Sequence, residues 1–368
     1  MWVGFKLIAV AGVALLLVWS TCLMHPDAAP NPLQGNQSET PPEVIPQIGS
    51  AAFSGSDLTW LVARRKGYLL HSSNGGASWR RLPASQITKS SQISFVDSEH
   101  GWAVAGDSDS QGHIWRSIDG GRTWSWLAKL NSDNPRWRFT GEVQLDFVDR
   151  LNGWLIETFS IWRTSDGGIS WKQVFSTGQM GGAQPGHGFF LNALQAWVCN
   201  SAGQVFKTTD GGKTWDVQTV RDKGYFTNIF FVDRNTGWLC SGDQMYRTDD
   251  GGRTWRLQAT LTESWQLESC FFVSKREGWV VGTRLLGPST GLPETNMRNN
   301  LVRGIVLHTL DGGETWMVVR IGQNEPFFHR VHFSSTQTGW LFSRDRVYRT
   351  INAGRTWRVV LNLPAIKA

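Results

Sequence analysis

The chain has 368 residues, 40 of them glycine and 21 tryptophan, and a formal net charge of +6. Its lysines and arginines are spread along the sequence without a compact basic run, and no standard nucleic-acid-binding module occurs, which argues against a nucleic-acid partner. The mild positive charge favours an acidic partner or surface only weakly.

The N-terminal segment differs from the rest in composition. Lys6 precedes a run of eighteen residues without a charge (7–24), just long enough to span a bilayer, and a Pro-rich stretch follows. We predict a membrane anchor or signal segment at 1–25 and a flexible linker at 26–44. An uncleaved anchor is favoured over a cleaved signal and over a lipoprotein modified at Cys22. In all three cases the remainder of the chain is exported.

An octapeptide close to S/T-x-D-G-G-x-S/T-W recurs seven times, with its closing tryptophans mostly 40 to 47 residues apart. The copies end at Trp79, Trp124, Trp171, Trp215, Trp255, Trp316 and Trp357. A second signature, close to F-V-D-x-x-x-G-W, precedes each copy and ends at Trp60, Trp102, Trp154, Trp197, Trp238, Trp279 and Trp340. Repeats of this period indicate a propeller or an array, because one unit cannot bury its own faces.

Each repeat unit is predicted to contain four short strands, which in the second unit lie at 92–96, 102–106, 113–117 and 123–128. Short β-rich runs between Gly, Asp, Asn and Ser are typical of antiparallel strands, and no later stretch has sustained helical periodicity. The sequence therefore predicts an all-β fold, a seven-bladed β-propeller of four-stranded antiparallel blades over 45–363, behind an N-terminal hydrophobic helix. Because every unit looks complete, the repeats do not indicate how the ring closes.

The octapeptide is predicted to form the turn between strands three and four. Its two glycines allow positive φ values, its Asp can accept backbone N–H groups, and the preceding Ser or Thr adds another local hydrogen bond. Most copies offer one carboxylate, too few for a Ca²⁺ site, and no Cys or His spacing indicates zinc. We expect no metal and no cofactor, and all glycine turns on one face.

The octapeptide resembles the Asp-box, or bacterial neuraminidase repeat, of sialidases, other glycoside hydrolases and non-enzymatic propellers. Combined with the second signature and the N-terminal hydrophobic segment, seven such units resemble the photosystem II assembly and stability factor family. The resemblance covers about residues 45–363. It implies a monomeric, membrane-tethered propeller on the periplasmic or lumenal side. Such a propeller would hold a reaction-centre precursor or another assembly intermediate of photosystem II.

The alternative is a sialidase-like glycoside hydrolase or a carbohydrate-binding propeller. A sialidase needs an arginine cluster, a Tyr–Glu nucleophile pair and an acidic proton donor. Tyr246 and Tyr348 occupy the aromatic slot of strand three and are predicted to be packing residues. The family's N-terminal arginine motif is missing, because RRLP (80–83) fits a fourth strand. We therefore expect no catalytic residues, since a shared fold does not confer a function.

Three cysteines lie in the predicted propeller. Cys199 and Cys240 occupy equivalent second-strand positions, and Cys270 begins the first strand of the following blade. Neighbouring blades can bring two of them together, and an exported protein can form a disulfide. Buried thiols that pack as small hydrophobic residues are the favoured interpretation.

A basic or imidazole residue lies three positions before the turn Asp or Asn in every unit. These residues are His71, Arg116, Arg163, Lys207, Arg247, His308 and Arg349. Three of the units carry an Asp in their first turn, which emerges at the same end of the blade. We therefore predict ion pairs within each blade, between Arg116 and Asp97, Arg163 and Asp149, and Arg247 and Asp233.

Loops at the opposite end of the blades combine arginines with aromatic residues, as binding hot spots do. The candidate binding residues are Arg136, Trp137, Arg138, Arg221, Lys223, Tyr225, Arg284, Arg298, Arg303, Phe327, Phe328 and Arg330. Three of these residues, Arg284, Arg298 and Arg303, lie in a long insertion at 282–304. We expect a protein partner on this face.

Overall fold

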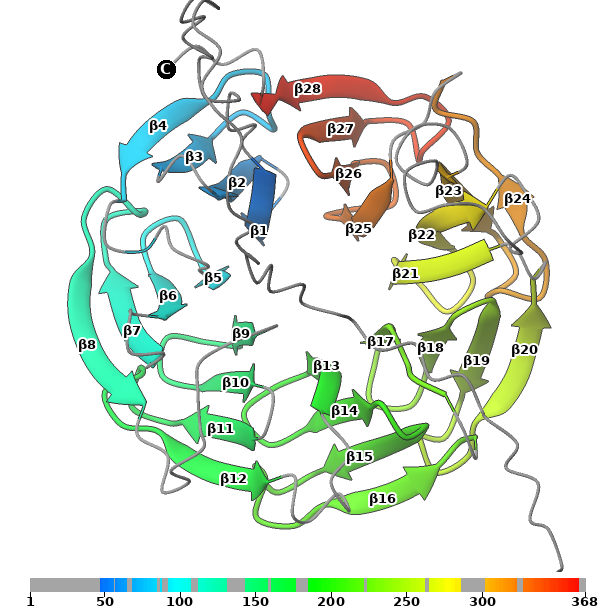
Figure 1. The fold of residues 1–368 in the computed structure, drawn as a ribbon, viewed down its shortest axis with the longest axis horizontal. Helices are drawn as coiled ribbons and strands as arrows, with labels where there is room; N and C mark the ends of the chain where they lie inside the picture. Colours follow the sequence, from blue (N-terminus) through cyan, green and yellow to red (C-terminus); the bar gives the residue numbers. More distant parts are fainter. Residues whose placement is uncertain are drawn as a thin grey trace, which may run out of the picture. The chain divides into compact units, whose positions relative to one another are not determined.

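The computed structural model describes residues 47–363 apart from 56, 65–67, 85–86, 88–91, 107–111, 131–142, 158–159, 177–184, 222–223, 262–264, 286–301 and 323–326. The described residues form seven four-stranded antiparallel sheets around a central axis (Figure 1), so the predicted seven-bladed propeller is confirmed. The predicted anchor at 1–25 and linker at 26–44 lie outside them. Among the residues that are described, no helix is long and apolar enough to cross a membrane.

Blades 1 to 4 contain β1 Gln47–Ser54, β2 Leu58–Arg64, β3 Tyr68–Ser72, β4 Arg80–Pro83, β5 Gln92–Phe95, β6 Gly101–Gly106, β7 Gly112–Ser117, β8 Ser125–Leu130, β9 Gln144–Phe147, β10 Gly153–Glu157, β11 Ser160–Thr164, β12 Lys172–Ser176, β13 Pro185–Phe190, β14 Ala196–Asn200, β15 Gln204–Thr208 and β16 Asp216–Thr219. Blades 5 to 7 contain β17 Asn228–Phe231, β18 Gly237–Ser241, β19 Gln244–Thr248, β20 Arg256–Thr260, β21 Trp265–Phe272, β22 Gly278–Leu285, β23 Val302–Thr309, β24 Met317–Val318, β25 Phe328–Phe333, β26 Gly339–Ser343, β27 Arg346–Thr350 and β28 Arg358–Asn362.

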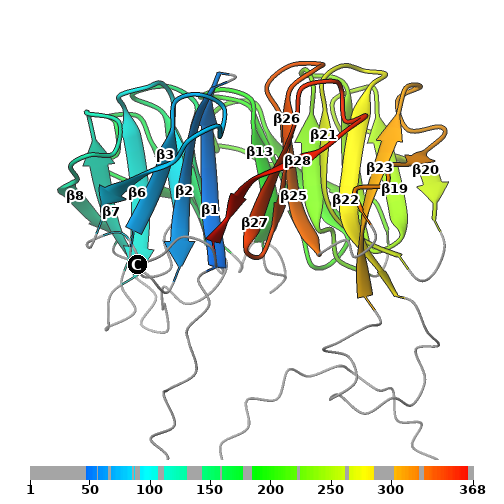
Figure 2. The same cartoon turned by 90° about the horizontal axis from the view of Figure 1, so that it is seen from above.

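Strands follow chain order within each blade, from the first strand beside the central channel to the fourth at the outer rim (Figure 1). The turns after strands one and three emerge on one side of the ring, which we call the glycine-turn face. The connections after strands two and four emerge on the other side, the loop face (Figure 2). The strands of blade 2 match their predicted positions within two residues, although Trp124 lies just before β8 rather than within it.

The hydrophobic core lies between neighbouring blades and is built from the two repeated signatures. All seven second-strand tryptophans are fully buried. Trp102 of blade 2 stacks on Phe147 of blade 3 with 3.8 Å between ring centroids. The octapeptide's Trp171 meets the same phenylalanine edge-on, at 5.9 Å and 88°. The phenylalanine of one blade therefore packs between the second-strand tryptophan of the preceding blade and the octapeptide tryptophan of its own blade, which explains why the two signatures recur in phase.

Four of the second-strand indoles, those of Trp60, Trp102, Trp197 and Trp238, also hydrogen-bond to the glycine turn of the following blade. Trp102 Nε1 donates to Gly167 O at 2.8 Å, and Trp238 Nε1 donates to Gly312 O at 3.0 Å. Phenylalanine could fill the same space but could not donate this bond. A buried indole N–H needs such an acceptor, so the turn and the tryptophan depend on each other.

The ring closes by packing of blade 7 against blade 1, without a strand shared between them. Ile48 N donates to Arg344 O at 2.8 Å, and Trp79 Nε1 donates to Val360 O at 2.9 Å. Phe53 of β1 stacks on His332 of β25 with a centroid distance of 4.0 Å. This seam uses backbone and aromatic contacts like those of the other interfaces, so no element of one unit has to be exchanged with another.

Candidate functional site

Each glycine turn is a closed hydrogen-bonded unit, as the turn of blade 6 shows. Thr309 Oγ1 donates to Asp311 Oδ1 at 2.8 Å, and Gly313 N donates to Thr309 Oγ1 at 2.8 Å. Thr315 donates to Asp311 from its backbone N at 3.0 Å and from its hydroxyl at 2.5 Å. The Thr315 hydroxyl and backbone bonds hold the pKa of Asp311 well below its usual range. The carboxylate is thus used inside the turn, and among the described residues no group of acidic, His or Cys side chains could hold a metal.

The ring of basic residues has a structural explanation that the sequence did not reveal. Each of the seven lies directly opposite a second-strand tryptophan across the β-ladder, as Arg116 does with Trp102 and Arg349 with Trp340. The charged groups of Arg116, Arg163, Lys207, Arg247 and Arg349 lie 5.4–5.7 Å from the facing indoles. His308 stacks on Trp279 at 4.6 Å. Cation–π and stacking contacts of this kind cover the rims of the buried indoles.

The predicted ion pairs within blades are wrong for Arg116 and Arg247. Asp97 binds Arg150 of the following blade at 2.9 Å, and Arg247 binds Asp249 in its own glycine turn at 2.8 Å. The basic side chains lie over the indoles instead of reaching the first turn of their own blade. The first-turn carboxylate is therefore available to a basic residue in the first turn of the next blade, as Asp97 is to Arg150.

Asp233, the predicted partner of Arg247, and the third predicted pair, Arg163 with Asp149, also differ from the expectation. Asp233 binds Lys275 of the following blade at 3.0 Å, so the ion pair again joins two blades. Arg163 donates to Asn152 Oδ1 at 3.3 Å. The pKa of Asp149 is lowered: burial alone would raise it, but the hydrogen bonds from Asn152 and Leu151 together outweigh burial, and the Arg163 charge adds a smaller lowering influence.

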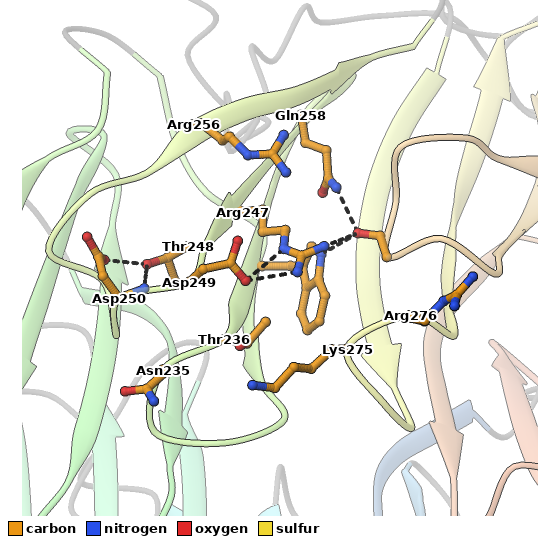
Figure 3. Close-up of polar contacts among 12 residues, drawn as sticks. Asn235, Thr236, Arg247, Thr248, Asp249, Asp250, Arg256, Gln258, Lys275 and Arg276 are labelled. Carbon is orange, nitrogen blue, oxygen red and sulfur yellow. Dashed lines mark hydrogen bonds and ion pairs between the residues drawn. The ribbon is translucent and has the colours of Figure 1, made fainter.

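A hollow of about 220 Å³ opens on the glycine-turn face at blade 5. It is lined by Thr254 and by Arg247, Asp249, Asp250 and Arg256, which are labelled in Figure 3. Both arginines are already paired, Arg247 with Asp249 and Arg256 with Glu314 at 2.7 Å. The charges of the hollow are therefore largely compensated within the propeller.

Three donors converge on one backbone carbonyl beside this hollow (Figure 3). Gly312 O accepts from Trp238 Nε1 at 3.0 Å, from Gln258 Nε2 at 2.8 Å and from Arg247 Nη1 at 3.4 Å. All three donors belong to blade 5 and the acceptor to blade 6. This arrangement fastens two blades together, and we assign Arg247 to blade packing rather than to ligand binding.

On the loop face, the two described arginines of the insertion lie side by side. Arg284 in β22 directly faces Arg303 in β23, and both side chains are exposed. These two strands have eight residues each, whereas β18 and β19 of blade 5 have five. Within the described part of the chain, no carboxylate pairs with either arginine. Like charges placed opposite each other destabilise a hairpin, so this arrangement has a cost that an anionic partner would offset.

Two of the predicted aromatic residues flank these arginines on the neighbouring blades. Tyr225 precedes β17 of blade 5 with 51% of its surface exposed, and Phe327 precedes β25 of blade 7 with 41% exposed. Both therefore lie where the first strands begin on the loop face. Exposed Arg344 and Arg346, in the β26–β27 turn of blade 7, add positive charge that the sequence analysis missed. The turn sequence SRDR, directly after strand two, is the signal that could have identified them.

Three predicted binding residues have other roles in the fold. Phe328 is fully buried in the cluster between blades 6 and 7, so its side chain belongs to the core. Arg330 donates to Ala51 O of blade 1 at 3.0 Å. Arg221 donates to Ser241 Oγ at 2.5 Å and fixes the link into blade 5. The remaining predicted residues lie outside the described ranges: Arg136, Trp137, Arg138, Lys223 and Arg298.

Comparison with known families and proteins agrees with the resemblance stated from the sequence. The model of the photosynthesis system II assembly factor YCF48 family matches residues 86–230. The photosystem II assembly lipoprotein Ycf48 of Synechococcus sp. (strain CC9902) is 25% identical over 150 residues, which is 40% of this chain and 41% of that protein. The chain is thus an Asp-box propeller that resembles this family, with a match that spans less than half of the relative's length.

Solved structures show the same fold. A structure described as YCF48 bound to D1 peptide has a TM-score of 0.62 at 16% identity, covering 84% of this chain and 94% of that one. YCF48 from Cyanidioschyzon merolae gives 0.62 at 18% identity, covering 85% and 97%. A GH74 xyloglucanase from Xanthomonas campestris gives 0.64 at 12% identity, covering 87% and 55%. Because hydrolases and assembly factors share this fold, the fold alone does not identify the activity.

Proposed function

We propose that this chain is a non-catalytic assembly factor that binds the reaction-centre subunit D1, or a precursor of it, during assembly of photosystem II. The family match over blades 2 to 4 and the description of a solved propeller as bound to a D1 peptide support this partner. The similarity to a xyloglucanase is one of fold, so we do not extend glycoside hydrolysis to this chain.

The proposed binding surface is the loop face of blades 5 to 7. The observation that carries it is the exposed pair Arg284 and Arg303 on the β22–β23 hairpin, flanked by exposed Tyr225 and Phe327. Arginine and aromatic side chains supply most of the binding energy at typical protein interfaces. On the glycine-turn face, by contrast, Arg247 and Arg256 are committed to Asp249 and Glu314.

We further propose that the protein is an exported monomer, held at the membrane by residues 1–25. The uncharged run at 7–24 supports a tether, and the similar Synechococcus protein is described as a lipoprotein. Residues 26–44 then act as a flexible spacer. Full-length protein should sediment with membranes, and removal of residues 1–25 should release it.

Binding to peptides that tile the D1 subunit tests the partner and the surface together. We expect full-length protein to bind at least one peptide, and the Arg284→Ala/Arg303→Ala variant to bind it at least about tenfold more weakly. The control variant is Arg122→Ala/Arg253→Ala, which removes the same charge from exposed positions on the glycine-turn face. Failure to bind any D1 peptide would contradict the partner. Weaker binding by the control variant alone would place the site on the other face.

A further inference from the structure

The seven blade interfaces share a second buried contact beside the Trp–Phe stack. Neighbouring second and first strands run antiparallel, so the residue two after the tryptophan meets the residue two before the phenylalanine. Both members of the pair are aliphatic in three of the seven interfaces. Each of these pairs lies within one buried cluster: Val62 with Ile93, Val104 with Leu145, and Val281 with Val331.

Between blades 5 and 6, two cysteines take this position. Trp238 stacks on Phe272 with a centroid distance of 3.5 Å and an angle of 3°. Cys240 lies two residues after Trp238 in β18, and Cys270 lies two residues before Phe272 in β21. Both cysteines belong to one buried cluster. Cα atoms of these two strands approach within 8 Å, and a disulfide requires the Cα atoms of its two cysteines to lie within about 7 Å of each other.

Asn228 links the two cysteine positions. Asn228 lies opposite Cys240 in the β17–β18 ladder. Its Oδ1 accepts from the backbone N of Cys270 at 3.2 Å and from Cys270 Sγ at 3.3 Å. The neighbouring Cys270 side chain, together with burial, raises the pKa of the Cys240 thiol. In the structure both cysteines are unoxidised thiols.

We propose that Cys240 and Cys270 form a disulfide that joins blade 5 to blade 6 when the chain folds under oxidising conditions. One thiolate attacks a small-molecule disulfide and releases its first thiol, giving a mixed disulfide. The second cysteine then attacks this intermediate and releases the second thiol. Overall two Cys S–H groups are converted to one S–S bond while the oxidant gains two electrons and two protons.

Burial determines when this reaction can occur. Cys240 is fully buried and Cys270 is only 2% exposed, and reactivity requires an accessible thiolate. Oxidation therefore takes place before blade 6 has packed on blade 5. Once formed, the bond is shielded from reductants. Cys199 differs because it shares its cluster with Ile229 and donates to His187 O at 3.2 Å, so it remains a thiol.

The test is synthesis of the full-length chain with glutathione disulfide or with dithiothreitol, followed by denaturation, alkylation and peptide mass mapping. We expect a peptide that links Cys240 to Cys270 in the oxidised sample alone, and a melting temperature a few degrees higher than in the reduced sample. Cys240→Val should remove both effects, and valine should be accommodated because valine or isoleucine occupies the equivalent position in several blades. Cys199→Val should keep both effects.

Two outcomes would overturn the proposal. One is complete alkylation of Cys240 and Cys270 in the oxidised sample. The other is a disulfide that uses Cys199 in place of either cysteine, because this would show that the packing register does not select the pair.

Discussion

At the residue scale, asparagine replaces the turn aspartate in blades 1 and 7 without changing the turn. Asn74 Oδ1 accepts from Ser78 N at 2.9 Å and Asn352 Oδ1 accepts from Thr356 N at 2.9 Å, as Asp210 does from Thr214 N at 3.0 Å. The turn thus needs an oxygen acceptor rather than a negative charge. The charge adds a dependence on pH.

Acid should weaken the propeller through these turns. The Thr214 hydroxyl and backbone N–H lower the pKa of Asp210 to about 2, and the Thr315 bonds lower the pKa of Asp311 similarly. An unfolded Asp titrates near about 4, so the stabilisation is complete above that pH and is lost as the pH falls toward about 2. We expect Asp210→Asn/Asp311→Asn to match the wild type near neutral pH and to lose less stability between about pH 4 and pH 2.

Thermal melting at a series of pH values measures this effect. The control is Asp345→Asn, an Asp outside the glycine turns. If the melting temperatures of the double variant and of the control fall with pH as that of the wild type does, the turn aspartates do not determine stability in acid.

At the element scale, the blade interfaces differ in whether the second-strand indole has an acceptor. Trp238 Nε1 donates to Gly312 O at 3.0 Å, whereas Trp279 Nε1 is buried and has no hydrogen-bond partner within the described residues. Both indoles stack on a first-strand phenylalanine, at 3.5 Å for Trp238 and 3.6 Å for Trp279. These two interfaces therefore separate the hydrogen bond from the stacking.

Replacement of each indole by phenylalanine should reveal this difference. Trp238→Phe loses both packing and a hydrogen bond, but Trp279→Phe loses packing while removing an unsatisfied donor. We expect Trp238→Phe to lower the free energy of unfolding by about 1 kcal/mol more than Trp279→Phe. Chemical denaturation measures both, and equal losses would mean that the indole N–H bond contributes nothing to blade packing.

The elements themselves were predictable, but their side-chain partners were not. The two signatures recur in phase and define seven blades, because every blade must form a glycine turn and pack against its neighbours. The separation of Trp102 from Arg116 differs from that of Trp279 from His308, since the hairpin between them varies in length. Register across a hairpin cannot be counted from such separations alone. The Trp–Arg contacts were therefore missed and ion pairs were expected instead.

At the scale of the whole molecule, polar side chains beside the channel link consecutive first strands. Gln144 Nε2 donates to Gly188 O at 2.8 Å, and Gln144 Oε1 accepts from Gly188 N at 2.9 Å. Ser50 Oγ accepts from Ile93 N at 3.2 Å. Arg330 performs this role where blade 7 meets blade 1, by donating to Ala51 O. Its sequence context, beside exposed Phe327, resembled a binding loop, and only the closed ring identifies it as a closure residue.

Arg330 also acts on the charge of the half-buried Asp146 in β9 of blade 3. Burial raises the pKa of Asp146, while the Gln144 hydrogen bond and the Arg330 charge oppose this rise. Removal of the Arg330 guanidinium would leave Ala51 O without this hydrogen-bond donor and Asp146 without this positive charge. Uncompensated groups of this kind are costly in enclosed surroundings, even where some water reaches them.

We therefore expect Arg330→Met to lower the free energy of unfolding by about 2 kcal/mol, and Asp146→Asn to recover part of that loss in the double variant. The exposed Arg346 of the same blade is the control, and Arg346→Met should change stability by no more than about 0.5 kcal/mol. Equilibrium denaturation of the four proteins gives the coupling between the two sites. Additive losses would show that Asp146 does not interact with Arg330 and would leave the Ala51 hydrogen bond as the sole contribution of Arg330 to ring closure. Loss of the guanidinium also removes an influence that lowers the pKa of Asp146, so the carboxyl becomes neutral at a higher pH in the folded variant, and a fall in pH should destabilise Arg330→Met less than the wild type if the two groups are coupled.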